Sequence, residues 1–306
     1  MRYHWGGLLL LILPALGLLN TGCPSKSSTS SPSGPSGPPS YSYGVSFGNS
    51  AATTMNVPNG LAVSGSNLWV ANENIFGYIQ EWTTAGSETL SSTTYNSHAY
   101  NFPRDAAAGP DGYIYIADGS HLVVELTSTG GYVTVFGTTE LGSDDLDGVA
   151  VGNTEAYLLD DTVPQVVAYT IGGSGASKTF TSPVSFGTAS LGAFPRGIGL
   201  DGSSNVYVAD YSNDRIVKFN SAGVSQTVVT LVSSGVPTGA AVDGAGYLYV
   251  SDNHNHEVQM FDSMGGTVTQ FGAADLAAAD GIAIDSSGNL YVSDGVNNRV
   301  VKFNRN

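Results

Sequence analysis

Histidines that accompany carboxylates are the residues of this sequence whose types and spacing could bind a metal. His254 and His256 stand two residues apart, and His254 or His121 could join Asp147 or Asp280 around zinc or calcium. A catalytic zinc typically needs three protein ligands that converge, and the sequence does not place three at matched positions. We therefore expect no cofactor, and bound calcium or zinc is the alternative.

A run of carboxylates is the second feature that could bind a cation. Asp144, Asp145 and Asp147 are followed by the pair Asp160 and Asp161. Such a cluster either binds calcium weakly or forms a solvated acidic loop, and both interpretations stay open at this point.

The sequence gives no support for nucleophilic catalysis. Ser120 stands beside His121 but has no partner in a nucleophile motif, and no Gly-x-Ser-x-Gly elbow occurs. We predict no catalytic residue.

The single cysteine, Cys23, lies in a segment typical of export. Residues 1–22 combine a positive charge at Arg2 with an apolar stretch from Leu8 to Leu19 that is too short to span a bilayer. The segment with its Asn20-Thr-Gly-Cys23 end resembles a bacterial lipoprotein signal, although Asn20 stands where that family usually has Leu. The resemblance implies lipidation of Cys23, and Pro24 favours sorting to the outer membrane.

The next segment, residues 23–40, predicts a flexible tether. Residues 26–40 are almost entirely Ser, Pro, Gly and Thr, which provide too little apolar surface to offset the entropy of ordering. The whole chain of 306 residues has a formal net charge of −15 and only ten Lys and Arg residues. Such an acidic chain repels phosphate backbones, so we expect no nucleic-acid partner and contact with a membrane through the lipid alone.

Short strands must position the candidate residues, because a strand–turn–strand unit recurs every 42 to 49 residues. A period of that size with several strands per unit indicates the blade of a β-propeller. One aromatic residue recurs in the second strand of every unit and is expected in the core. These six residues are Trp69, Tyr115, Tyr157, Tyr207, Tyr249 and Tyr291.

The sixth unit lacks a fourth strand because the chain stops three residues after Phe303. Residues 41–48 end in a Phe-Gly pair, as do predicted fourth strands at Phe136, Phe186 and Phe271. We therefore predict an all-β, six-bladed propeller over residues 41–306, whose four-stranded antiparallel blades close through an N-terminal strand in the last blade.

The clearest units resemble NHL repeats. Residues 195–219 begin Pro-Arg-Gly, and Asn213-Asp-Arg215 lies in their second loop. That family forms six-bladed propellers, and the resemblance covers nearly all of residues 41–306. Asp105 replaces the opening glycine of the second unit, and residues 162–165 replace the Asn-Asp-Arg triplet of the third.

In a propeller, the segment before each first strand and the loop after each second strand lie on one face, called here the loop face. We expect Tyr211 and His254 to stand above the mouth of the central channel on this face. Alternating Arg and Asp residues there suit a polar ligand, and suit equally a mouth that pairs its own charges. One residue per unit is expected at the mouth: Asn59, Arg104, Asp147, Arg196, Thr238 and Asp280.

These expectations favour an exported, lipid-anchored monomer that binds an envelope protein or glycan at its loop face, or serves as a scaffold at the bacterial cell envelope. The alternative is a metal-dependent enzyme. The fold is similar to that of six-bladed lactonases and of the lyase that finishes peptide amidation, which hold a metal in the central channel. Fold alone does not choose between these classes.

Overall fold

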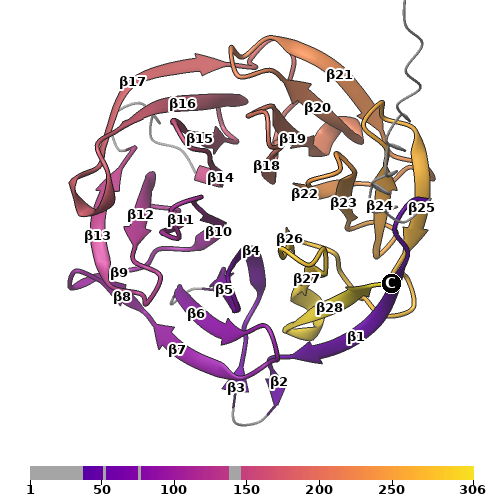
Figure 1. Cartoon of the computed structure of the whole chain (residues 1–306), viewed down its shortest axis with the longest axis horizontal. Coiled ribbons are helices and arrows are strands. Elements are labelled where there is room, and N and C mark those ends of the chain that lie inside the picture. The colour runs from indigo at the N-terminus through magenta and orange to yellow at the C-terminus, as the bar shows by residue number, and fades with distance from the viewer. Residues whose placement is uncertain (1–36, 51–52, 75–76, 138–145) are drawn as a thin grey trace, which may run out of the picture. The chain divides into compact units, whose positions relative to one another are not determined.

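The computed structural model describes residues 37–50, 53–74, 77–137 and 146–306. From Pro38 onward the chain is one compact unit. It contains six four-stranded antiparallel sheets, arranged as blades around a central axis (Figure 1). The predicted fold class is therefore confirmed. No helix in these ranges is long and apolar enough to cross a membrane.

Each of the first five blades is built from four consecutive strands, and the first strand of each lies next to the axis. Blade 1 holds β4 (Pro58–Ser64), β5 (Asn67–Asn72), β6 (Tyr78–Thr83) and β7 (Glu88–Ser92). Blade 2 holds β10 (Pro103–Ala108), β11 (Ile114–Asp118), β12 (Leu122–Leu126) and β13 (Tyr132–Phe136). Blade 3 holds β14 (Leu146–Val151), β15 (Glu155–Asp160), β16 (Gln165–Gly172) and β17 (Thr179–Phe186).

The remaining blades follow the same plan. Blade 4 holds β18 (Ile198–Leu200), β19 (Val206–Asp210), β20 (Arg215–Phe219) and β21 (Ser225–Thr230), and blade 5 holds β22 (Pro237–Val242), β23 (Leu248–Asp252), β24 (Glu257–Phe261) and β25 (Thr267–Phe271). Blade 6 holds β26 (Ile282–Ile284), β27 (Leu290–Asp294), β28 (Arg299–Arg305) and β1 (Tyr41–Phe47). The connections contain the short hairpins β2 (Asn49–Ser50) with β3 (Thr53–Thr54) and β8 (Thr94–Tyr95) with β9 (His98–Ala99), and the 3-10 turns η1 (Gly175–Ser177), η2 (Tyr211–Asn213) and η3 (Gly295–Asn297).

The N-terminal strand β1 closes the ring, as the sequence predicted. It pairs antiparallel with β28, with Tyr41 opposite Arg305 and Phe47 opposite Val300, and the two strands lie side by side in Figure 1. The ring of Tyr41 stacks on Phe271 of blade 5 at 4.8 Å between centroids. At its other end, Phe47 packs against Trp82 of blade 1. The strand therefore ties together three blades.

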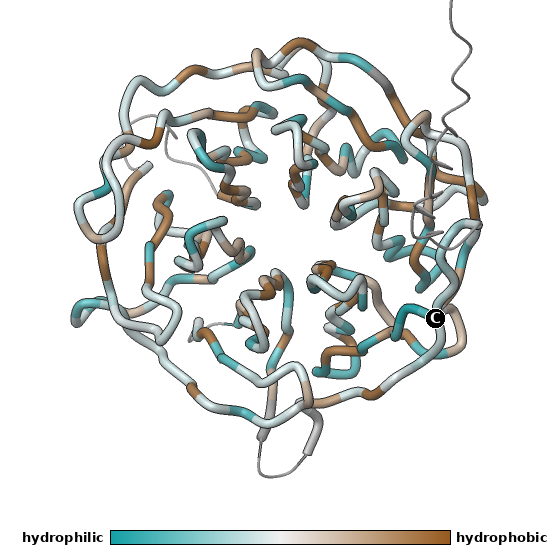
Figure 2. Tube along the Cα trace, viewed as in Figure 1, coloured by the Kyte–Doolittle hydropathy of each residue, from teal (hydrophilic) through white to brown (hydrophobic). Residues whose placement is uncertain are grey.

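The core lies between neighbouring blades, because both faces of each sheet are covered. Hydrophobic stretches accordingly recur in every blade around the ring (Figure 2). The six second-strand aromatics are between 0% and 7% exposed, which confirms their predicted place in the core. Two of the aspartates that close second strands accept hydrogen bonds from arginines of the same blade, at 2.6 Å for Arg215 to Asp210 and 2.9 Å for Arg299 to Asp294.

The glycines that open the inner strands let neighbouring blades approach closely. A Cβ atom on Gly281 would lie 2.2 Å from the carbonyl oxygen of Asn59, and one on Gly197 would lie 2.6 Å from that of Thr238. Any side chain at these positions would push the blades apart. The inner strands therefore stand close enough for their first residues to share one small cavity.

Candidate functional site

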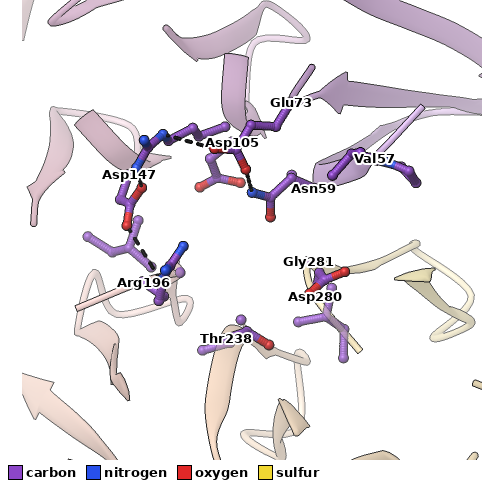
Figure 3. Close-up of a pocket in the computed structure, with 17 residues that line it drawn as sticks. Val57, Asn59, Glu73, Asp105, Asp147, Arg196, Thr238, Asp280 and Gly281 are labelled. Carbon is purple, nitrogen blue, oxygen red and sulfur yellow. Dashed lines mark hydrogen bonds and ion pairs between the residues drawn. The ribbon is translucent and has the colours of Figure 1, made fainter. Parts of the chain in front are cut away.

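A polar cavity of about 160 Å³ lies at the loop-face mouth of the central channel. It is lined by the starts of all six inner strands (Figure 3). The six residues predicted for the mouth all line it: Asn59, Arg104, Asp147, Arg196, Thr238 and Asp280. The spacing of the repeats thus predicted which residues line the cavity, while the binding role of these residues stays a prediction.

A chain of charges runs along one side of the cavity. A hydrogen bond joins Nη1 of Arg104 to Oδ1 of Asp147, and Nε of Arg104 lies 3.4 Å from Oε1 of Glu73. Asp161 lies 3.7 Å from the same guanidinium. On the other side of Asp147, Nε of Arg196 lies 3.9 Å from Oδ2. Part of the mouth therefore pairs its own charges, as one of the two interpretations expected.

The pairing between Asp147 and Arg196 is incomplete. Within the described residues, neither Oδ2 of Asp147 nor Nε of Arg196 has a hydrogen-bond partner, although both atoms are buried. The side chain of Asp147 is only 3% exposed. Burial raises the pKa of Asp147, and the charge and hydrogen bond of Arg104 oppose that rise. The cavity wall therefore holds an acceptor and a donor that pair by charge but form no hydrogen bond.

Tyr211 completes this part of the mouth. The guanidinium of Arg196 lies over its ring at 5.2 Å from the centroid, in cation–π contact. Tyr211 begins η2, which follows β19, so its place above the mouth agrees with the expectation from sequence. This contact holds the Arg196 side chain at the edge of the cavity, where it remains 40% exposed.

Two further carboxyl groups line the cavity, and burial raises the pKa of both. For Asp105 the value rises to about 7, although its oxygens accept hydrogen bonds from the N–H groups of Ala106 and Val149. For Asp280 it rises to about 6, although Gly295 N–H and Asn253 Nδ2 donate to it. These values lie close to neutral pH, where a carboxyl group can both give and take a proton.

Replacing Asp105 with glycine, the residue at the equivalent place of the other five blades, is expected to change the pH dependence of stability. Because the folded state holds the Asp105 proton more tightly than the unfolded chain does, its contribution is full below about pH 4 and is lost as the pH rises through 7. Relative to wild type, Asp105→Gly should flatten this fall by up to about 1.4 kcal/mol per pH unit. Urea unfolding between pH 4 and 8 measures the difference, and parallel curves would contradict it.

The remaining predicted residues have other contacts. Asn59 donates to Oε2 of Glu73 at 2.8 Å, and the hydroxyl of Thr238 donates to the carbonyl of Ala279 in the next blade at 2.5 Å. His254 is exposed and does not line the cavity. Sequence reasoning missed Glu73 and Asp105 as mouth residues. The signal for Asp105 was its substitution for glycine.

A metal site is not formed by the side chains that the structure describes. Within the described ranges, no three His, Cys, Asp or Glu residues come together in a group that could hold an ion. Cys23 and the predicted signal and most of the predicted tether lie outside the described residues, as do Asp144 and Asp145 of the acidic run. The predictions made for them stay predictions.

Comparisons with known proteins agree with the propeller. Residues 276–303 match the family model of the NHL repeat. No curated protein matches the sequence significantly.

Solved structures share the fold at low identity. Virginiamycin B lyase from Staphylococcus aureus, solved with quinupristin, has a TM-score of 0.61 at 14% identity over 82% of this chain and 84% of that one. A gluconolactonase from Xanthomonas campestris has a TM-score of 0.61 at 15% identity, over 82% and 87%. A chain of a nidogen/laminin complex has a TM-score of 0.59 at 17% identity, over 75% and 85%.

Proposed function

We propose that this propeller is a binding module whose ligand occupies the mouth cavity, in an exported protein that is lipid-anchored at the bacterial cell envelope. The observation that carries the binding function is that two buried atoms at the cavity wall, Oδ2 of Asp147 and Nε of Arg196, pair by charge but lack hydrogen bonds within the described residues. A buried polar group without a partner costs about 1–3 kcal/mol. A ligand that donates to Asp147 and accepts from Arg196 recovers much of that cost.

The envelope location rests on a different part of the chain. It follows from the export-type segment of residues 1–22, from Cys23 and from the Ser/Pro/Gly-rich residues after it. Extraction of membranes with detergent, with Cys23→Ala as the comparison, tests this part separately from ligand binding. If the variant stays with the membrane as wild type does, the lipid anchor is refuted.

Structural neighbours allow both binding and catalysis. One belongs to a nidogen/laminin complex, while others are a virginiamycin B lyase and a gluconolactonase. At such low identity they support the fold alone, and the site must decide. Arg104, Asp147 and Glu73 pair with one another at the mouth, which would hold these groups in place for a bound ligand.

A second candidate function is catalysis of proton transfer. It is favoured by the raised pKa values of Asp105 and Asp280, about 7 and about 6, in one cavity. Metal analysis of the dialysed protein separates the candidates. Stoichiometric zinc or calcium would favour an enzyme, because a metal would polarise the substrate there.

Replacing Arg196 with alanine is expected to abolish ligand binding and to leave stability nearly unchanged. Arg196 is partly exposed, and its charge pair with Asp147 spans 3.9 Å without a hydrogen bond. Its loss should cost little stability, because the pair is long and Asp147 keeps its hydrogen bond from Arg104. Arg104 is unsuitable for this test because its hydrogen bond to buried Asp147 supports the fold.

The measurement compares envelope partners captured by immobilised wild type, Arg196→Ala and the control Arg305→Ala. Arg305 is on the opposite face, 3.5 Å from Asp243. Equal capture by all three proteins would refute the mouth as the binding site.

A further inference from the structure

Large apolar side chains are exposed on the loop face, where the mouth cavity opens. Each precedes an inner strand or follows a second strand, so the topology of the blades places it on that face. We call these residues the rim. The rim consists of Val57 (42% exposed), Phe102 (39%), Val163 (43%), Phe194 (57%), Tyr211 (36%) and Val296 (70%). Every blade except the fifth contributes at least one of these side chains. Exposed apolar side chains beside a polar centre suit a contact surface.

The backbone holds three rim side chains outward in a strained conformation. Val57, Phe102 and Phe194 have φ angles of +54°, +49° and +56°. Each directly precedes a proline, which restricts its backbone further. A left-handed conformation costs a residue other than glycine about 1–3 kcal/mol, and such strain clusters at functional sites. Because these side chains are exposed, packing in the interior does not compensate for it.

The lysines that the structure describes lie away from the mouth, as protein interfaces favour. All three described lysines contact turns of the opposite face: Lys178 reaches Asp111, Lys218 reaches Asp201 and Lys302 reaches the Thr84 carbonyl. The mouth cavity is lined by arginines instead, Arg104 and Arg196. Interfaces between proteins are enriched in Arg and aromatic residues and depleted of Lys.

The centre of the surface selects a neutral hydrogen-bonding group. Asp147 and Arg196 together carry no net charge, and the acceptor Oδ2 and the donor Nε, which lie 3.9 Å apart, lack hydrogen bonds within the described residues. An anion would face Asp147, Glu73 and Asp280, and a cation would face the two arginines. A carboxamide or hydroxyl group both donates and accepts, so it can bond both atoms once the partly exposed Arg196 side chain turns toward it.

We propose that the loop face docks a segment of another protein, which places a carboxamide or hydroxyl side chain in the mouth and apolar side chains on the rim. This inference rests on the proposed binding function and narrows its ligand from protein or glycan to protein. A sugar could bridge Asp147 and Arg196, but it would leave the aliphatic side chains of Val57 and Val296 without a contact.

The test uses two defined probes, a phage-displayed library of random twelve-residue peptides and an array of bacterial glycans. Peptides selected on wild type are synthesised, and their Kd values are measured. Asparagine adopts the left-handed backbone readily, so Phe102→Asn with Phe194→Asn removes two rim side chains without loss of stability. The matched control is Val184→Asn, which removes a side chain that is 62% exposed on β17, away from the loop face.

The proposal predicts that the double rim variant raises the Kd of selected peptides more than tenfold, that Arg196→Ala does the same, and that Val184→Asn leaves Kd unchanged. If Arg196→Ala weakens binding but the double rim variant does not, the rim proposal is wrong and the binding mouth stands. Glycan binding that depends on Arg196 but not on the rim would likewise refute the rim proposal and support the mouth as a binding site. If no peptide prefers wild type over the double variant, the proposal is likewise refuted. If Arg196→Ala changes nothing for any bound probe, the mouth itself is refuted.

Discussion

Replacing Lys178 with methionine is expected to lower the free energy of unfolding by about 3–5 kcal/mol, the usual cost of removing one partner of a buried ion pair. Lys178 directly precedes β17 of blade 3, but its ammonium group lies in blade 2. There it donates hydrogen bonds to Glu125 and to the hydroxyl of Tyr115, and it pairs with Asp111 at 2.6 Å. The side chains of Lys178 and Glu125 are 4% and 0% exposed.

The expected loss of stability arises because the substitution leaves Glu125 without its positively charged partner. Burial alone would lower the pKa of Lys178, but the hydrogen bonds to Asp111, Glu125 and Tyr115 raise it, so the lysine is charged in the fold. Without it, the Glu125 carboxylate is buried with no cation beside it. Oε2 of Glu125 already lacks a hydrogen-bond partner within the described residues. The variant must therefore keep a buried charge without a cation or separate blade 2 from blade 3.

A double variant separates charge from packing. Met260 of blade 5 stands opposite Tyr249, just as Glu125 stands opposite Tyr115. Lys178→Met with Glu125→Met should therefore recover most of the stability, because neither partner is left unpaired. Unfolding in urea gives the three free energies. Equal losses in the single and double variants would show that the lysine acts through packing alone.

Removing β1 is expected to have an effect of similar size. A chain that starts at Asn49 should unfold with about 3–6 kcal/mol less free energy than one that starts at Pro38, because it no longer buries two aromatic side chains. Phe47 is 7% exposed against Trp82, and Tyr41 stacks on Phe271 and donates to the Tyr249 hydroxyl at 2.9 Å. The edge of β28 would also be exposed, which promotes aggregation.

A peptide of residues 38–48 provides the control for this deletion. Added in trans, it should pair with β28 and restore the unfolding midpoint, as strand addition does at other open sheet edges. A peptide with Phe47→Ser should restore less. If the chain from Asn49 unfolds at the same urea concentration as the longer chain, the ring does not depend on β1.

The sequence was sufficient to predict the blades because the repeats have both a period and a core residue. In the last unit, apolar stretches separated by turn residues predict three strands at residues 282–284, 290–293 and 299–303. The structure has them at 282–284, 290–294 and 299–305. The prediction was less accurate for the outer strand of blade 4. The sequence predicts this strand at residues 227–232, and the structure has it at Ser225–Thr230. An outer strand pairs along one edge only, and a bulge between Val217 and Phe219 shifts its register.

The mouth could be predicted because one residue in each repeat occupies an equivalent place. Its hydrogen bonds could not, because they depend on side-chain conformation. From the sequence, Asp105 stood out only as an exception to a glycine pattern. In the structure, its carboxyl group accepts a hydrogen bond from Val149 N–H of the next blade. Lys178 and Glu125 are 53 residues apart and belong to different blades, so no local pattern connects them.

The first and last strands of the propeller lie on one sheet, and this arrangement determines how the propeller responds to tension. Asn306 N–H donates to the Ser40 carbonyl at 3.0 Å, and Tyr41 stands opposite Arg305. A force that separates Ser40 from Asn306 pulls along the hydrogen bonds between β1 and β28, because these bonds run perpendicular to the strands. The residue pairs of the two strands therefore bear the load one at a time. Strand β1 would detach from β28 pair by pair at low force, while the other five blades stay intact. Mechanical load would therefore release a single strand long before the propeller unravels.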